Sequence, residues 1–232
     1  MKIITLAIGP VSNSYLIRGE NGSILLDTGC YTTKEEVGKE YAAKGVDPKE
    51  IKLIVLTHGH FDHCGGVDIA EELTGAPILC HRETLKFLET GYFPPYQPRD
   101  AAGKKFIDEI AGPAPNDVPD PVKVTYVVGD EDFDLHPLGF NGKIIYTPGH
   151  INSAISLVMD SGDVFVGDTI KGHDFDASHY CCLAHICDDR EALDKSVRRL
   201  LEEGTMFYSG HFGPFTKAEL EEAAKRAETE SL

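Results

Sequence analysis

The sequence of 232 residues has few basic side chains, no long apolar run and no Cys-x-x-Cys pair. Lysine and arginine total 22 against 38 aspartates and glutamates, which gives a net charge of −16. Because such an acidic surface repels phosphate backbones, we expect no nucleic-acid partner. No apolar run approaches the ~20 residues needed to cross a bilayer, so we expect no membrane association through a spanning segment.

The six cysteines include no Cys-x-x-Cys pair, which argues against a structural zinc knuckle. Residues 1–8 contain one lysine and a short apolar run that Gly9 and Pro10 stop, so we expect a first strand here rather than a signal peptide. In the absence of an export signal, reduced thiols and a cytoplasmic location are the expectation.

Strand and helix signals alternate along the chain, and no linker separates them. We expect helices to open at the capping box Thr32-x-x-Glu35, at Asp188, and at Thr216-x-x-Glu219, the last of these helices being polar. Apolar segments bounded by turn residues predict strands before, between and after these helices. The pattern therefore predicts one α/β domain over 1–232, with two sheets inside and helices outside.

Residues 91–121 differ in character from the rest, because seven prolines are crowded there. The segment is too long and too rich in proline for a simple connector, although it can hold a short helix near 104–110. We expect a loop insertion. Long loops in compact domains often act as lids or binding loops, and a surface excursion with no role is the alternative.

The densest chemical signal lies in residues 52–66. An apolar run leads there into four metal-ligating side chains within six residues: His58, His60, Asp62 and His63. In a chain with 10 histidines, this pattern at fixed offsets arises by chance on the order of once in a thousand chains. A metal site is therefore favoured over a polar loop that merely follows a strand.

Three further ligand candidates each follow a predicted strand and lie beside a glycine: His150, Asp168 and His211. Glycine lets the chain turn sharply and approach a metal closely. Loops at one end of packed sheets can converge on a single point, so these residues are candidates for the same site.

These residues resemble the metallo-β-lactamase superfamily, in particular its glyoxalase II and lactonase-like hydrolases. The ligand pattern is His58-x-His60-x-Asp62-His63, then His150, Asp168 and His211. The supporting motifs are Asp27-Thr28-Gly29, Thr147-Pro148-Gly149-His150, Gly167-Asp168-Thr169 and Ser209-Gly210-His211. The resemblance implies an αββα four-layer sandwich of two mixed β-sheets flanked by helices, with a two-metal site at the edge between the sheets.

Within this resemblance, one metal is held by His58, His60 and His150. Asp62, His63 and His211 hold a second metal, and Asp168 bridges both. Each metal keeps an open position for water, which is typical of catalytic sites. The expected nucleophile is a hydroxide bridging two metals ~3.5–4 Å apart, and Asp62 is the expected catalytic proton carrier.

The predicted function is that of a metal-dependent hydrolase of a small ester, thioester or lactone. Two divalent metal ions are expected, with zinc first and iron or manganese as alternatives. One alternative function is a mononuclear iron dioxygenase acting on a thiol or persulfide substrate; another is a non-catalytic metal-binding sensor or partner module. After His150 the chain reads Ile151-Asn152-Ser153-Ala154, which differs from the sequence of many thioesterase relatives. This departure bears on the identity of the substrate and leaves the set of predicted metal ligands intact. The only predicted partner is a small-molecule substrate, and no oligomeric state is predicted.

Other chemically active residues are interpreted as structural or as lining the site. Cys64 is interpreted as a small buried side chain, with an oxidation-sensitive role as the alternative. Residues 173–187 contain three histidines and three cysteines, which we expect to pack and to line the pocket rather than to form a separate metal site or a Cys181–Cys182 disulfide. Three tyrosines are candidate hydrogen-bond donors to a substrate carbonyl: Tyr92, Tyr96 and Tyr180.

Overall fold

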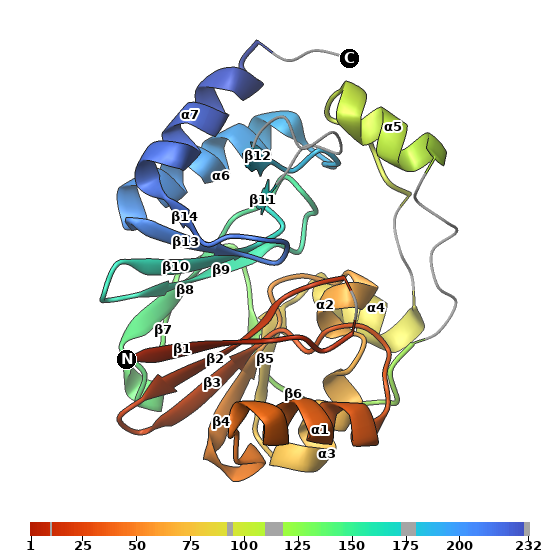
Figure 1. Ribbon diagram of the computed structural model, residues 1–232, viewed down its shortest axis with the longest axis vertical. Coiled ribbons are helices and arrows are strands. Elements are labelled where there is room, and N and C mark those ends of the chain that lie inside the picture. Colours follow the sequence, from red (N-terminus) through yellow and green to blue (C-terminus); the bar gives the residue numbers. More distant parts are fainter. Residues whose placement is uncertain (10, 92–94, 110–117, 173–179, 230–232) are drawn as a thin grey trace. The chain divides into compact units, whose positions relative to one another are not determined.

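The computed structural model describes residues 1–9, 11–91, 95–109, 118–172 and 180–229 (Figure 1). The chain divides into two compact units, which are described separately below. The first unit comprises 1–93, 115–129 and 135–141, and the second comprises 94–114, 130–134 and 142–232. Each unit contains one six-stranded mixed sheet together with helices, which confirms the predicted α/β class with two mixed sheets. The grouping of 1–232 into a single domain stays a prediction.

The sheet of the first unit runs in sequence order through β1 (Lys2–Leu6), β2 (Ser14–Gly19), β3 (Gly22–Leu26), β4 (Ile51–Val55), β5 (Ile78–His81) and β6 (Val124–Val128). The first three strands form an antiparallel meander, whereas β3 to β6 pair in parallel. Parallel neighbours need crossover connections. Because β3 and β4 run in the same direction, their carboxyl ends lie at the same edge of the sheet.

Helices supply these crossovers in the first unit: α1 (Lys34–Lys44), η1 (Pro48–Glu50), α2 (Phe61–Cys64), α3 (Val67–Thr74) and α4 (Thr84–Thr90), with a later 3₁₀ turn η2 (His136–Leu138). Their apolar faces pack onto the sheet, where Tyr41, Val67 and Phe87 are buried against Leu25 and Ile54. This burial stabilises the edge of the sheet from which the predicted ligands extend.

The capping box of α1 lies one residue later than predicted. Thr33, not Thr32, accepts a hydrogen bond from the Glu36 amide, at 3.2 Å, and the Glu36 carboxylate reaches back to the Thr33 amide. The Thr32 hydroxyl instead donates to the Glu36 carboxylate at 2.7 Å. Two adjacent threonines can both fit the capping pattern, and only the backbone conformation decides which of them caps.

The sheet of the second unit has the spatial order β14 (Phe215–Thr216), β13 (Met206–Ser209), β10 (Asp163–Gly167), β9 (Ile155–Met159), β8 (Gly142–Tyr146) and β7 (Phe133–Asp134). β10 and β13 are parallel, and both β8 and β10 are antiparallel to β9. It follows that β8, β10 and β13 all run in the same direction, so their carboxyl ends share one edge.

Two short strands of the second unit, β11 (Ile170–Gly172) and β12 (Cys181–Leu183), pair with each other and were not predicted. At three residues each, they are too short to show an alternating pattern. The helices are α5 (Ala101–Glu109), α6 (Arg190–Glu203) and α7 (Lys217–Ala227). The short helix expected near 104–110 thus begins at Ala101.

The ends of α6 and α7 test two further capping predictions. Asp189, not Asp188, caps α6 by accepting from the Ala192 amide at 3.0 Å, whereas the box at Thr216 is confirmed. The last helix is amphipathic rather than polar, because Leu220 and Ala223 are buried in the apolar core of the unit. Among the described helices, none has the length and apolar character that a membrane crossing requires.

The α1 cap yields a direct test on stability. Thr33→Ala should lower the free energy of unfolding by ~1 kcal/mol, because the Glu36 amide loses its acceptor. Thr32→Ala is the matched control and should cost less, since it removes only a bond between exposed side chains. Chemical denaturation of both variants measures the difference, and an equal or larger loss for Thr32→Ala would contradict the assignment.

Candidate metal centre

In the first unit, the ends of β3 and β4 are joined by the carboxylate of Asp27. Asp27 follows β3, and its amide donates to the Val55 carbonyl of β4 at 2.8 Å. The Asp27 carboxylate accepts from the Thr57 amide at 2.7 Å and from the Thr57 hydroxyl at 2.8 Å. Asp27 adopts a φ of 57°, in the left-handed region that aspartate tolerates better than most residues.

The same carboxylate orients two of the predicted metal ligands. His63 Nδ1 lies 2.8 Å from Asp27 Oδ2, and His58 Nδ1 lies 3.0 Å from Thr57 Oγ1. Because the Thr57 hydroxyl already donates its proton to Asp27, its oxygen accepts from His58. Both imidazoles therefore carry their proton on Nδ1 and present the lone pair of Nε2, which is the form that a metal ligand needs.

His60 and Asp62 complete the cluster of ligands in the first unit. His58 and His60 offer ligand atoms within 4.8 Å of each other, and their rings meet edge to face with centroids 4.6 Å apart. Asp62 Oδ2 lies 3.7 Å from His63 Nε2. His60 precedes α2, whereas Asp62 and His63 lie within it. The segment thus changes from extended to helical between the two pairs, and its side chains gather in one small volume.

Close backbone packing holds α2 in place. The Thr28 amide donates to the His63 carbonyl at 2.7 Å. A Cβ on Gly65 would lie 2.3 Å from the Phe61 carbonyl oxygen. A Cβ on Gly66 would lie 2.6 Å from the Thr28 carbonyl oxygen. Only glycine fits at such distances, so the Gly65-Gly66 pair allows the Asp27-Thr28-Gly29 motif to contact the ligand helix directly.

In the second unit, the carboxylate of Asp168 lies between two histidines. Asp168 Oδ2 is 3.1 Å from His211 Nε2 and 3.8 Å from His150 Nε2. The three residues follow β10, β13 and β8, whose carboxyl ends share one edge of the sheet. His150 Nδ1 donates to the Ile186 carbonyl at 2.9 Å, so its Nε2 again carries the lone pair.

The chemistry of these donors fits divalent metal ions. Imidazole nitrogens with carboxylate oxygens suit zinc, iron or manganese. Three of the histidines have Nδ1 engaged, and each thereby directs Nε2 toward the other candidate ligands of its own unit. The chain therefore contains His/Asp residues capable of metal binding. The roles of the individual ligands, and of Asp62 in catalysis, stay predictions.

The cysteines among the described residues are buried and free, so Cys181 and Cys182 form no disulfide. Cys64 Sγ donates to the His60 carbonyl at 3.2 Å, and burial raises the pKa of this thiol well above its ordinary value. Its interpretation as a small buried side chain agrees with this environment, since a protonated thiol is a poor nucleophile.

Some loop residues named in the sequence analysis can be placed. Tyr96 packs edge to face with Phe106, and Tyr180, 47% exposed, does so with Phe215. Tyr92, His173 and His179 lie outside the described residues.

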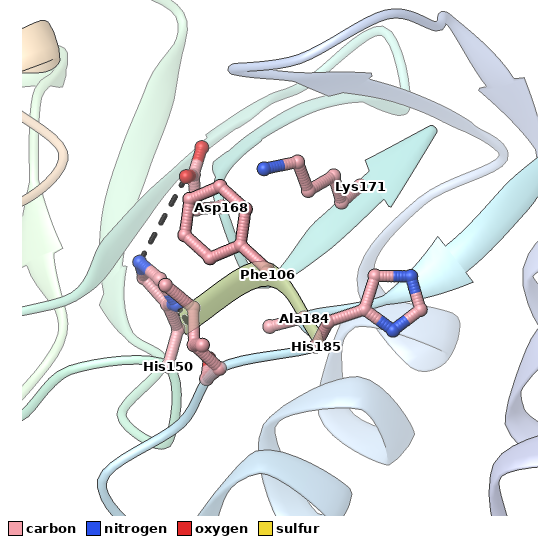
Figure 2. Close-up of a pocket in the computed structure, with 7 residues that line it drawn as sticks. Phe106, His150, Asp168, Lys171, Ala184 and His185 are labelled. Carbon is pink, nitrogen blue, oxygen red and sulfur yellow. Dashed lines mark hydrogen bonds and ion pairs between the residues drawn. The ribbon is translucent and has the colours of Figure 1, made fainter. Parts of the chain in front are cut away.

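A pocket of the second unit opens beside its metal-ligand candidates. Its lining residues are Phe106, His150, Asp168, Lys171, Ala184, His185 and Ile186 (Figure 2). Phe106 extends from α5, and the Lys171 amino group lies 5.5 Å from the centre of its ring. The expectation that the segment 173–187 lines the pocket is confirmed for its described part, through His185. The predicted insertion also contributes, through Phe106.

Comparison with known proteins identifies the family. The family model described as "Metallo-beta-lactamase superfamily" matches residues 8–215. The chain belongs to this superfamily. A relative from Methanocaldococcus jannaschii named "Probable metallo-hydrolase MJ0888" is 30% identical over 162 residues, which cover 70% of this chain and 68% of the relative. The chain is therefore a hydrolase of the metallo-β-lactamase superfamily.

Solved structures show the same fold. ST1585, an archaeal metallo-β-lactamase superfamily protein from Sulfolobus tokodaii, aligns with a TM-score of 0.67 at 22% identity. The alignment covers 97% of this chain and 85% of the ST1585 chain. TTHA1623, solved in a di-iron-bound form, aligns with a TM-score of 0.62 at 25% identity. The alignment covers 94% of this chain and 96% of the TTHA1623 chain. The predicted metallo-β-lactamase fold is thus confirmed.

Sequence reasoning missed the residues that orient the ligands. Asp27 was noted only as part of a motif, and Thr57 had no assigned role. No sequence pattern identifies the Ile186 carbonyl as the acceptor for His150, because every residue has a backbone carbonyl. A usable signal existed for Asp27 and Thr57, because Asp27 directly follows β3 and Thr57 comes two residues after the end of its parallel neighbour β4. Polar residues at such positions lie together at one sheet edge.

Replacing Asp27 tests its orienting role. Asp27→Asn should weaken metal affinity by about 10–100-fold, because the neutral amide holds His63 and Thr57 less firmly. Competition with a chromophoric chelator measures this affinity, and the surface variant Asp108→Asn should leave it unchanged. If Asp27→Asn folds as the parent does and binds metal equally well, the orienting role is wrong.

Proposed function

We propose that the protein hydrolyses a small ester, thioester or lactone at a two-metal site. The observation that carries this proposal is the contact that Nδ1 of His58, His63 and His150 makes with a neighbouring oxygen atom. Each is held through Nδ1 by an acceptor, so each offers Nε2 to a metal. Membership in a hydrolase superfamily supports the same chemistry.

The proposed ligand sets follow the family pattern. His58, His60 and His150 would hold one metal, and Asp62, His63 and His211 would hold the other. Asp168 would be shared between them, and its Oδ2 lies near Nε2 of both His211 and His150. With three protein ligands and the shared carboxylate, each metal retains space for water or substrate.

When bound, two such ions lower the pKa of water toward neutrality and so supply hydroxide as the nucleophile. The chain's own residues fix the geometry around this nucleophile. Asp27 and Thr57 hold two of the imidazoles, and the Ile186 carbonyl holds a third. Asp62, with 13% of its side chain exposed, is the residue that we propose takes up a proton and passes it on.

We propose zinc as the resident metal. Neutral imidazole with carboxylate is a common zinc donor set, and it also accommodates iron. The similarity to TTHA1623 in its di-iron-bound form, at 25% identity, makes iron the specific alternative. The small-molecule substrate and the absence of a nucleic-acid partner are likewise proposals, the second resting on the acidic charge of the chain.

Metal analysis tests the two-metal proposal. Protein purified without added metal should contain two equivalents of zinc per chain, and chelation should abolish hydrolysis of a panel of esters, thioesters and lactones. Adding back zinc should restore it. Full activity in metal-free protein would overturn the proposal, and one equivalent of iron with oxygen uptake on a thiol substrate would favour the dioxygenase.

Asp168→Ala tests the bridging carboxylate. Loss of both oxygens should remove metal and lower kcat/KM by about 100-fold or more, since even the loss of an outer partner typically costs 10–100-fold. Elemental analysis and steady-state kinetics measure the two effects, with Asp108→Ala as the surface control. A variant that keeps both metals and its activity would contradict the assignment.

A further inference from the structure

The segment 95–109 of the insertion is hydrogen-bonded to residues 184–187, which include His185 and Ile186. The Arg99 amide donates to the His185 carbonyl at 2.8 Å, and Arg99 Nε donates to the Ala184 carbonyl at 2.7 Å. The Cys187 amide donates to the Gln97 carbonyl at 2.9 Å, and Pro98 forms a bridge with Ile186. The described segment 95–109 therefore packs within the second unit.

A buried group of charged side chains lies beneath this contact. Arg99, Asp100 and His185 are each exposed by 4% or less. Asp100 Oδ2 pairs with Arg99 and lies 2.9 Å from His185 Nδ1, while Oδ1 accepts from the Gly103 amide in the first turn of α5 at 2.8 Å. Charges buried in this way are stable only when paired and hydrogen-bonded, so the group fixes where α5 begins.

Two features favour an ionised Asp100 and a tightly packed α5. Burial favours the neutral carboxyl of Asp100. Hydrogen bonds from His185 and Gly103, with the charges of His185 and Arg99, outweigh burial and hold its pKa below the ordinary value. A Cβ on Gly103 would lie 1.8 Å from the His185 carbonyl oxygen, so only glycine permits this approach.

Phe106 lies one helical turn beyond Gly103, on the same face of α5. It lines the pocket beside His150 and Asp168, together with two other apolar side chains, Ala184 and Ile186 (Figure 2). The pocket therefore combines the ligand candidates of the second unit with an apolar wall. Such a combination is typical of sites in which polar groups orient a ligand and apolar groups bind its hydrocarbon part.

We propose that Phe106 is a specificity-determining residue that contacts the hydrocarbon part of the substrate, and that Asp100 and Gly103 are positioning residues that hold it there. This inference rests on the proposed hydrolysis at the metal site, and it narrows the substrate class to esters, thioesters or lactones with an apolar chain. The affinity for the substrate should consequently rise with chain length.

The first test compares Phe106→Ala with the parent on two series of thioesters, one varied in the acyl chain and one in the leaving group. In at least one series, KM of the parent should fall as the chain lengthens. Phe106→Ala should raise KM for the longest members by about 10-fold, with little change for the shortest, because each buried methylene contributes to discrimination. Lys105→Ala, on the exposed side of α5, should match the parent.

Gly103→Ala should reproduce the change in KM without altering metal content, because its added methyl group displaces α5 from His185. If Gly103→Ala fails to fold, Phe106→Leu provides the second comparison and should give an intermediate dependence on chain length. A parent and a Phe106→Ala variant with the same dependence in both series would overturn the inference while leaving the proposed hydrolysis intact.

Binding of the hydrolysis products separates this inference from the proposed function. Calorimetry with straight-chain carboxylic acids and thiols of increasing length requires no turnover. If the parent hydrolyses nothing but binds longer products more tightly, and Phe106→Ala loses about 10-fold in that affinity, the apolar subsite at Phe106 stands and the hydrolysis is wrong. If the parent binds none of these products, the apolar subsite does not exist.

Discussion

The hydrogen bonds of the Asp27 carboxylate are the interaction on which the ligand cluster of the first unit depends. One oxygen contacts the Thr57 amide, and the other is shared by the Thr57 hydroxyl and His63. Through Thr57 the same carboxylate also controls His58. A single buried aspartate side chain thus orients two imidazoles, which a polar loop without such a partner would not achieve.

The direction of the strands explains why distant residues meet. Parallel pairing of β3 with β4 brings Asp27 beside Thr57, and the common direction of β8, β10 and β13 brings together His150, Asp168 and His211. The site is therefore a consequence of sheet topology, and the glycines beside the ligands permit the close turns. The second unit adds an apolar wall through α5, whose position depends on buried charge pairing.

Sequence alone was sufficient for the family and the fold class, because these depend on motifs at fixed spacing, whereas the ligand assignments stay predictions. It was insufficient where tertiary contacts decide. Thr32 and Thr33 both satisfy the capping pattern, and only the local backbone shows that Thr33 is the cap. The docking of 95–109 onto 184–187 depends on two contacts, Arg99 with the Ala184 carbonyl and Asp100 with His185, and in each of them a separation of 85 positions conceals the pairing.

The central claim is that histidines held through Nδ1 present Nε2 to two metal ions. The proposed ligands of these ions are the motif at His58–His63 together with His150, Asp168 and His211. A crystal structure of the purified protein, with anomalous data collected on both sides of the zinc and iron absorption edges, tests it most directly. The account predicts two anomalous peaks, each coordinated through Nε2, with Asp168 between them. A single peak, coordination through Nδ1, or no metal at these residues would contradict it.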